Sequence, residues 1–317
     1  MENTLQDFSD PSVERIPIQV LLATYNGAKY LDEFLKSLLA QVGVEIELIV
    51  SDDGSSDETL NIIEKYRDSF EKLHIYAGPG KGPSENFFSL LEIAAGEYMA
   101  FADQDDIWEP THLHNSVKRL EQFANVPALT FSQSLAFGEE IGKQIPWPRI
   151  KKMSSKILFA QNLARGCTEV FNRKLVELVL AYSHDASVMH DWWLAQVAAS
   201  CGTILFEPSV EVFYRIHNAN SIGIPKPNFF PKAIQSKQRV WEPAEQLNSL
   251  FENFAQNMHR KTEIEISKFL QNLTGGLVRR VCFLTFSPNR FRLRFIDEIK
   301  IRLGFAFYPL FFDLSEN

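Results

Sequence analysis

The first hundred residues alternate between short apolar runs and segments whose apolar residues recur at helical spacing, and this alternation restricts the fold more than any other feature. Ile16–Ala23 is an almost continuous apolar run, which is typical of a strand that is covered on both faces. The other predicted strands are Glu45–Val50, Leu73–Tyr76 and Tyr98–Ala102, and the helical segments between the strands are Tyr30–Leu39, Glu58–Phe70 and Asn86–Ala95. Strands and helices that alternate through short connections form βαβ units. We therefore predict an α/β protein with a mixed, mainly parallel sheet flanked by helices.

Polar clusters follow three of these strands, at the edge where parallel sheets bind ligands. They are Thr24-Tyr25-Asn26, Ser51–Ser55 and Asp103–Asp106. Each cluster alone could be a turn with helix-capping side chains. Crowded carboxylates, however, raise one another's pKa unless a cation or a hydrogen-bond donor compensates them. The Asp103-x-Asp105 spacing is too short for an EF-hand loop, but it suits a divalent ion that keeps water ligands and also binds a diphosphate.

The composition is that of a folded globular protein, with 45% hydrophobic and 23% charged residues among 317. This balance excludes disordered and collagen-like chains. The cysteines, Cys167, Cys201 and Cys282, form no CxxC pair, which predicts reduced thiols rather than a disulfide framework or a zinc site. The sequence shows no secretory signal and no apolar run of about 18 residues, so we expect a cytoplasmic protein.

Charge is unevenly distributed along the chain. The net charge is −8 overall, but residues 1–231 carry −12 and residues 232–317 carry +4. The acidic first part is a poor surface for nucleic acid, so we expect no nucleic-acid partner.

The C-terminal region combines basic and aromatic residues. They alternate through Arg279–Phe295, and the apolar segment Phe305–Phe312 follows. This pattern is typical of a peripheral contact with a membrane, here at the inner face of the cell membrane. The alternatives are a packed helical subdomain and a homodimer contact.

Six stretches of the chain, taken in order, carry a family resemblance. They are VLLATYNGAKYLDEFLKSLLAQ (20–41), IVSDDGSSDET (49–59), FADQDDIW (101–108), RGCTEVFNR (165–173), MHDWW (189–193) and YRIHNANSIG (214–223). The chain resembles the family 2 glycosyltransferases with the Rossmann-like GT-A fold, and it is especially similar to bacterial rhamnosyltransferases. The resemblance implies a catalytic domain over residues 1–230, a nucleotide-sugar donor, Mg²⁺ or Mn²⁺, and inversion at the anomeric carbon. Residues 231–317 find no counterpart in it, and we expect a helical extension there.

The resemblance also implies roles at the donor site. Thr24 and Tyr25 would flank the nucleobase, and Asp53 would bind its edge. Asn86 is a plausible hydrogen-bond donor to the nucleotide and also a plain helix-start residue. Asn26, Gln104 and His217 complete the expected donor site, with His217 against the metal or the diphosphate. Lys81 could reach a phosphate, although a solvated lysine is the simpler interpretation.

The metal and the base are expected at two other motifs. Asp103 and Asp105 would form the DxD site, with Asp105 as the direct metal ligand and Asp103 nearer the ribose. Asp106 would bind the metal or orient its waters. Asp191 would be the catalytic base, because a carboxylate is favoured at the start of a helix and the neighbouring tryptophans can partly desolvate it. The alternative is that Asp191 only caps that helix. His190 is a neighbour that could tune Asp191.

These inferences together predict a metal-dependent, inverting glycosyltransferase. It would move a sugar, rhamnose from dTDP-rhamnose, onto a lipid-linked glycan acceptor in O-antigen or capsule-type polysaccharide synthesis. One alternative is the same fold with a UDP-hexose or UDP-N-acetylhexosamine donor, and another is a non-catalytic sugar-nucleotide-binding partner. A dinucleotide oxidoreductase would need a GxGxxG motif, which the sequence lacks.

Overall fold

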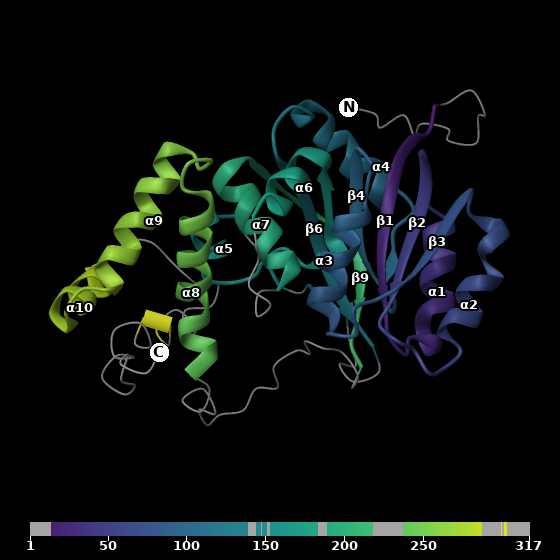
Figure 1. Cartoon of the computed structure of the whole chain (residues 1–317), viewed down its shortest axis with the longest axis horizontal. Helices are drawn as coiled ribbons and strands as arrows, with labels where there is room; N and C mark the ends of the chain where they lie inside the picture. Colours follow the sequence, from purple (N-terminus) through teal and green to yellow (C-terminus); the bar gives the residue numbers. More distant parts are fainter. Residues whose placement is uncertain are drawn as a thin grey trace. The chain divides into compact units, whose positions relative to one another are not determined.

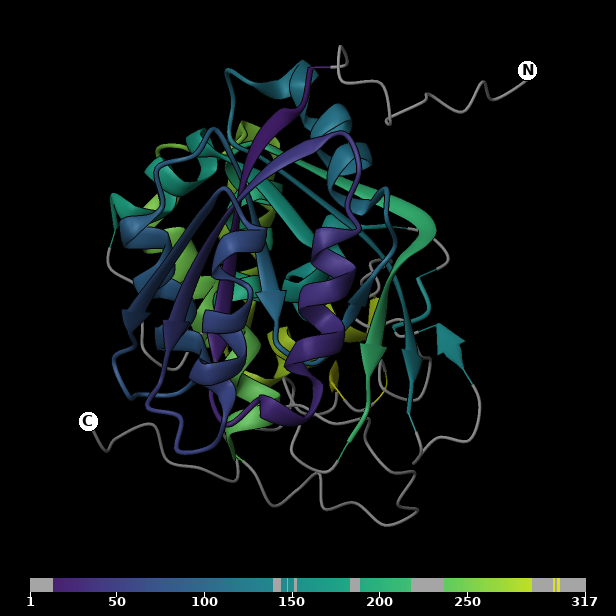
Figure 2. The same ribbon diagram turned by 90° about the vertical axis from the view of Figure 1, so that its right-hand side faces the viewer.

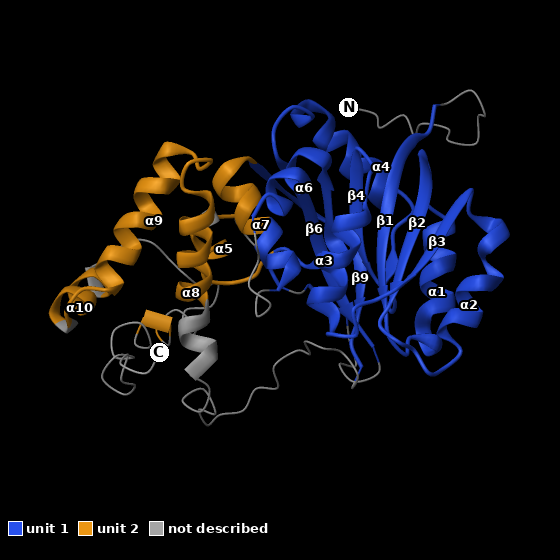
Figure 3. Ribbon diagram, viewed as in Figure 1, with its two compact units in different colours: residues 1–149, 164–194, 203–223 blue, residues 150–163, 195–202, 224–317 orange. Residues whose placement is uncertain are grey.

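The computed structural model describes residues 14–138, 144–146, 148–150, 153–182, 189–217, 237–286, 299 and 301–302. The chain forms two compact units, coloured blue and orange in Figure 3. Unit 1 comprises residues 1–149, 164–194 and 203–223, and unit 2 comprises residues 150–163, 195–202 and 224–317. No single cut of the chain separates the units, so the boundary at residue 230 stays a prediction.

The first half of the sheet in unit 1 is parallel (Figure 1). Its strands are β1 (Ile16–Thr24), β2 (Val44–Asp52), β3 (Lys72–Ala77) and β4 (Tyr98–Asp103), in the order β3-β2-β1-β4. Seen from the β3 side in Figure 2, the strands fan out with the twist of a parallel sheet. Val20, Leu21 and Leu22 of β1 are fully buried, which confirms that this strand is covered on both faces, whereas most residues of the edge strand β3 are exposed.

The second half of the sheet is mixed. Antiparallel β8 (Glu169–Asn172) joins β4 to β6 (Ala128–Phe137), and β9 (Thr203–Arg215) runs parallel to β6. The two-residue strands β5 (Ile107–Trp108) and β7 (Ile145–Pro146) pair with β9 and β6. The prediction of a mixed, mainly parallel sheet is therefore confirmed.

Three helices connect the parallel strands: α1 (Ala28–Leu39), α2 (Thr59–Lys65) and α3 (Pro83–Ile93). The prediction of one helix over Glu58–Phe70 was wrong, because the Tyr66 N–H bonds to Ile63 O and the chain tightens into a 3₁₀ turn, Arg67–Ser69. Helix α3 begins earlier than expected, since Pro83 has a backbone angle suited to a first helical position. The other helices that include residues of unit 1 are α4 (His112–Leu120), α6 (Arg173–Leu180) and α7 (His190–Cys201).

Unit 2 contains α5 (Ser155–Leu158), α8 (Lys237–Phe254), α9 (Arg260–Leu273) and α10 (Leu277–Phe286). Leu273 and Leu284 lie in its core, and Phe283 packs against them. Arg280 was expected on a membrane-facing stripe, but it is buried and its Nη1 donates to Gly275 O at 2.7 Å. The rest of that stripe, residues 287–298, and the apolar segment 305–312 lie outside the described residues. Within the described part, we find no helix with the length and hydrophobicity of a membrane span.

Candidate functional site

A cleft of about 1330 Å³ opens in unit 1 at the carboxyl ends of β1, β4 and β9. Side chains from the β1–α1 loop, the β2 end, the β4 turn and the start of α7 line it. It brings together every site residue expected from the sequence except Asp106: Thr24, Tyr25, Asn26, Asp53, Asn86, Asp103, Gln104, Asp105, Asp191 and His217. Segments far apart in the sequence therefore meet where a parallel sheet binds its ligand.

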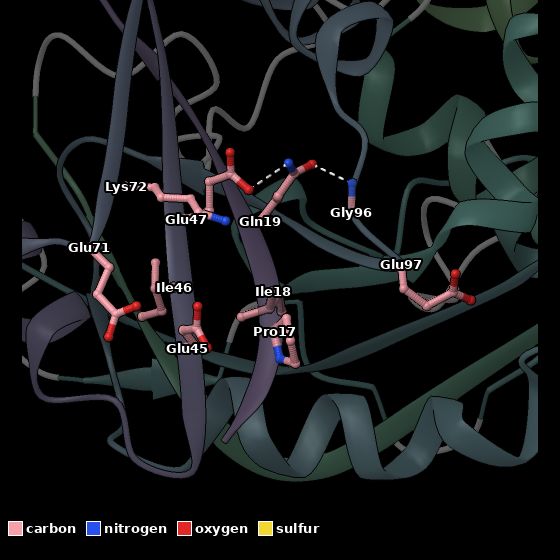
Figure 4. A pocket seen from close by; sticks show the side chains of 10 residues that line it. All are labelled: Pro17, Ile18, Gln19, Glu45, Ile46, Glu47, Glu71, Lys72, Gly96 and Glu97. Atoms are coloured by element: carbon pink, nitrogen blue, oxygen red, sulfur yellow. Dashed lines mark hydrogen bonds between the residues drawn. The ribbon is translucent and has the colours of Figure 1, made fainter. Parts of the chain in front are cut away.

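A second cavity lies at the opposite edge, where β1 and β2 begin (Figure 4). Its volume is about 60 Å³, too small for a nucleotide. Gln19 spans it, donating from Nε2 to Glu47 Oε2 at 3.0 Å and accepting from Gly96 N at 2.7 Å. These groups complete one another's hydrogen bonds and connect the strands. We therefore assign this cavity to the structure of the sheet and not to a ligand site.

The β1–α1 loop is held in place by two amides that the sequence suggested for donor binding. Gln104 forms two hydrogen bonds with the Tyr25 backbone, one to N and one to O, each 3.0 Å long. A Cβ on Gly27 would lie 2.0 Å from Gln104 Oε1, so only glycine permits this approach. Asn26, with φ of 47°, accepts from Ser56 N at 2.8 Å. Both amides therefore fix the loop, and Tyr25, which is 58% exposed, lines the cleft.

The two aspartates that follow β2 have different surroundings. Asp52 is buried, and its Oδ2 accepts from Thr24 Oγ1 at 2.7 Å, so the Thr24 hydroxyl is directed into the fold. Asp53 lines the cleft, and its carboxylate accepts from Gly80 N at 2.9 Å and from Gly82 N at 3.0 Å. Each carboxylate oxygen can accept a further hydrogen bond, so Asp53 both shapes the glycine loop and remains able to bind a base edge.

Asn86 lines the cleft, and its amide nitrogen already bonds to the sheet. Its Nδ2 donates to Ser51 O at 3.0 Å, while its Oδ1 is buried and has no hydrogen-bond partner. A buried amide oxygen without a donor is costly, and a ligand N–H that reached it would remove that cost. Lys81 is exposed and is not among the residues that line the cleft.

Three carboxyls crowd the turn after β4. Burial, together with the charges of Asp105 and Asp191, raises the pKa of Asp103 to about 7. Burial also raises the pKa of Asp105, although the hydrogen bond and charge of His217 oppose it. A divalent cation would replace these protons, and carboxylate oxygens are the ligands that Mg²⁺ and Mn²⁺ prefer. The residues present therefore fit the metal that the resemblance implies.

Residues at the end of β9 and just after it hold the turn that follows β4 in place. His217 Nε2 lies 2.6 Å from Oδ2 of Asp105, the residue expected to bind the metal directly. The Arg215 backbone N–H donates to Asp106 Oδ1 at 2.9 Å, and Arg215 Nε donates to Asp105 O at 2.7 Å. Arg215 is thus a site residue that the sequence analysis missed, although it stands two residues before His217 in the same motif.

Asp106 lies beneath the floor of the cleft instead of lining it. It is fully buried, and a ligand oxygen of Asp106 lies within 4.8 Å of the corresponding atoms of Asp103 and Cys167. Burial and the neighbouring carboxylates raise its pKa well above the ordinary value, although a hydrogen bond with the Cys167 thiol opposes this. Burial likewise raises the pKa of that thiol, so Cys167 stays protonated. Asp106 is therefore a buried neighbour of Asp103 and Asp105, and Cys167, its hydrogen-bond partner, itself lines the cleft.

Arg165 is a cation of the cleft that the sequence analysis did not single out. Its guanidinium lies 4.3 Å from the centre of the Tyr214 ring, and its charge partly offsets the rise in the pKa of Asp103. Its position at the start of the RGCTEVFNR motif was the available signal. An arginine at this place can face the negative charge of a diphosphate.

Asp191 lines the cleft at the first turn of α7 and is 8% exposed. Its Oδ1 accepts from Trp192 N at 2.7 Å and its Oδ2 from Gly166 N at 3.2 Å, so the carboxylate is fixed in direction. Trp193 is fully buried. Asp191 stands both in the first turn of α7 and in the lining of the cleft. Its carboxylate can therefore stabilise the start of the helix and also act on a substrate.

His190 packs among aromatic side chains beside Asp191. Its ring stacks on Phe87 with centroids 4.0 Å apart and meets Phe101 edge-on at 5.0 Å. Burial lowers its pKa to about 4, against the opposing charge of Asp191. His190 is therefore neutral near pH 7 and lies next to the carboxylate of Asp191.

Known glycosyltransferases are similar to this chain in sequence. The family model described as Glycosyl transferase family 2 matches residues 19–176. A dTDP-rhamnosyl transferase of Shigella flexneri, RfbG, is 28% identical over 215 residues, which cover 64% of this chain and 73% of that protein. An uncharacterized glycosyltransferase of Rickettsia felis is 24% identical over 84% of this chain, which spans only 42% of that relative.

Solved structures show the same architecture. TarS 1–349 of S. aureus, in complex with UDP-GlcNAc, has a TM-score of 0.59 and 17% identity over 92% of this chain and 82% of that chain. The mannosyltransferase PcManGT of Pyrobaculum calidifontis, in complex with GDP-Man and Mn²⁺, has a TM-score of 0.52 and 16% identity over 96% of this chain and 90% of that chain. At these identities the likeness is one of fold, and it confirms the GT-A prediction.

Proposed function

The chain belongs to the family 2 glycosyltransferases, and we propose that it transfers rhamnose from dTDP-rhamnose to a lipid-linked glycan acceptor with inversion at the anomeric carbon. The observation that carries the proposal is the meeting of Asp103, Asp105 and Asp191 in one cleft. A transferase of this kind needs carboxylates that hold a cation for the diphosphate, and a separate general base that deprotonates the acceptor hydroxyl.

The donor would bind along the carboxyl ends of β1, β2 and β4. Tyr25 offers an exposed ring to the nucleobase, and Asp53 and Asn86 offer acceptors to its edge. Asp103 and Asp105 would hold Mg²⁺ or Mn²⁺, with His217 against Asp105. The bound ion would act as a Lewis acid on the leaving diphosphate. Arg165 adds positive charge on the same side of the cleft.

Asp191 would act as the general base. It takes the proton of the acceptor hydroxyl while that oxygen forms a bond to the anomeric carbon. The bond from this carbon to the diphosphate oxygen breaks, and its electron pair leaves with the nucleoside diphosphate. Two main-chain N–H groups already orient the carboxylate, so little reorganisation is needed. A single displacement of this kind inverts the configuration.

Rhamnose is proposed because of the likeness to the Shigella transferase. A UDP-N-acetylhexosamine is the second candidate, since the TarS structure of the same fold contains UDP-GlcNAc. The lipid-linked acceptor, O-antigen or capsule-type synthesis and a place at the inner membrane face rest on the sequence resemblance and on the basic, aromatic tail.

Release of nucleoside diphosphate from a donor panel tests this function. The full-length chain with Mn²⁺ is incubated with dTDP-rhamnose, UDP-glucose, UDP-GlcNAc and GDP-mannose. We expect the fastest release from dTDP-rhamnose, and none from any donor in excess EDTA until Mn²⁺ is restored. Fastest release from UDP-GlcNAc would favour the second candidate. Binding without release would favour a non-catalytic partner, and full release in EDTA would contradict the metal site.

A further inference from the structure

Arg215, the last residue of β9, is held by several independent contacts. Its guanidinium lies 4.7 Å from the ring centre of Tyr30 and 4.5 Å from that of Phe137. Its Nη2 lies 2.5 Å from Glu33 Oε2, and its Nε donates to Asp105 O at 2.7 Å. A planar guanidinium that meets two aromatic rings and bonds along its edges keeps one orientation. The acidic turn that Arg215 supports is therefore oriented as well.

The Tyr30 ring contacts a second residue that bears on the same turn. The ring centroids of Tyr30 and His217 are 4.7 Å apart, and His217 Nε2 lies 2.6 Å from Asp105 Oδ2. Tyr30 and Glu33 stand three positions apart on α1, so they lie on the same face of that helix. One face of α1 therefore contacts both β9-end residues that hold Asp105.

We propose that Glu33 and Tyr30 are positioning residues for divalent-cation binding, which act on Asp105 through Arg215 and His217. The inference rests on the proposed metal–diphosphate site and assigns its support to α1. Glu33 is not among the residues that line the cleft, so an effect of Glu33 on cation binding that exceeds a general charge effect would pass through Arg215.

The ion pair between Glu33 and Arg215 decides which substitution of Glu33 is informative. The Glu33 side chain is 56% exposed, and a neutral replacement of a half-exposed ion-pair partner has little effect. Glu33→Lys instead places a cation beside Arg215 and pushes the guanidinium away from Asp105. Loss of a residue that orients a metal ligand typically weakens metal affinity about 10- to 100-fold. We expect a loss of about tenfold, at the lower end of that range, because Glu33 acts through Arg215.

The matched control is Asp32→Lys, one position earlier on α1. It makes the same change in net charge, and Asp32 is also about half exposed, at 53%. Asp32 pairs with Lys36 at 2.6 Å and accepts from Tyr66 Oη at 2.6 Å, so its contacts lie away from Arg215. A general electrostatic effect on cation binding would appear in both variants equally.

The experiment titrates Mn²⁺ into full-length protein with saturating dTDP and follows free Mn²⁺ by electron paramagnetic resonance. Calorimetry measures dTDP binding without metal. We expect Glu33→Lys to bind Mn²⁺ about tenfold more weakly than the wild type, Asp32→Lys to stay within about twofold, and metal-free dTDP binding to be unchanged in both. Tyr30→Phe should keep the wild-type affinity for Mn²⁺, and Tyr30→Leu should lose it.

Equal Mn²⁺ affinities of Glu33→Lys and Asp32→Lys would overturn the inference and leave the proposed function intact. A loss of metal-free dTDP binding in Glu33→Lys would also overturn it, because that result indicates a general disturbance of the cleft. A wild-type protein that binds no Mn²⁺ with dTDP would instead remove the proposed metal site and the inference together.

Discussion

His190 shows how burial makes the stability of this fold depend on pH. Its folded-state pKa is about 4, whereas an imidazole in an unfolded chain titrates near 6.5. Between these values the unfolded chain binds more protons than the folded one. We therefore expect stability to fall as the pH drops from about 6.5 to about 4, by on the order of 3 kcal/mol.

Urea unfolding of the wild type and of His190→Phe, at pH 7 and at pH 4.5, isolates this contribution. The phenyl ring keeps the stacking on Phe87 and cannot be protonated. The pKa values of Asp103 and Glu169 are raised in the folded state, so these groups change stability in the opposite direction. Their contribution to stability falls as the pH rises above the pKa that each carboxyl has in the unfolded chain. These groups are present in both proteins and cancel in the difference. An equal loss on acidification in both proteins would contradict the assignment to His190.

Individual residues also show which features of the site the sequence could predict and which it could not. The strand-end positions of Asp53, Asp103 and Asp105 followed from local pattern alone, because the ends of parallel strands meet at one edge of a sheet. That the Asn86 amide nitrogen bonds to Ser51, or that Gln104 holds the Tyr25 backbone, depends on contacts between distant loops. No local periodicity reports such contacts.

At the scale of elements, α4 and β9 are joined by buried charges. Glu211 on β9 is 4% exposed, and it pairs with Arg119 Nη2 at 2.7 Å and with His112 Nδ1 at 3.2 Å. Burial alone would raise the pKa of Glu211, but the hydrogen bonds and charges of these partners outweigh it and lower the pKa. The stability contributed by this carboxylate is therefore present above its unfolded pKa and is lost as the pH falls below it.

Arg119→Gln should lower the free energy of unfolding by about 3 kcal/mol, because it leaves a buried carboxylate without its main partner. Lys118→Gln is the matched control. Lys118 pairs with Glu121 at 2.8 Å on the exposed side of the same helix, and its loss should cost less than about 1 kcal/mol. Chemical denaturation measures both values, and equal costs would show that the network contributes no more than a surface pair.

The elements themselves were largely predictable. β1, β2 and β4 were recognised because short strand-like and helix-like segments alternate in this part of the chain, and the structure extends each strand by only one to three residues. The end of α2 before Tyr66 could not be predicted, because it depends on a local tightening of the backbone rather than on the spacing of apolar residues. The buried position of Arg280 in unit 2 was also missed, since a hydrogen bond to a main-chain carbonyl such as Gly275 O leaves no mark in the spacing of side chains.

At the scale of the whole molecule, the C-terminal region is predicted to hold the enzyme on an anionic membrane. Each basic side chain near such a surface contributes about 1 kcal/mol, so replacing Arg290, Arg292 and Arg294 with Gln should weaken binding to anionic liposomes more than about 100-fold at low salt. The control variant replaces Lys36, Lys118 and Lys174 with Gln, which makes the same charge change in unit 1. Sedimentation with liposomes measures both, and wild-type protein that ignores these liposomes would favour the packed or dimeric alternative.

The central claim, that the cleft transfers a sugar with Asp191 as base, is tested most directly by the transfer rate of Asp191→Asn. The amide keeps the size of the side chain and can still accept the N–H of Gly166, but it cannot take a proton. Glu177→Gln, at an exposed position paired with Lys174, controls for the substitution itself. With the preferred donor and acceptor, the account predicts that Asp191→Asn binds dTDP like the wild type and transfers about 10²- to 10⁴-fold more slowly, while Glu177→Gln is unaffected. Transfer by Asp191→Asn at close to the wild-type rate would contradict the account and return Asp191 to a helix-start residue.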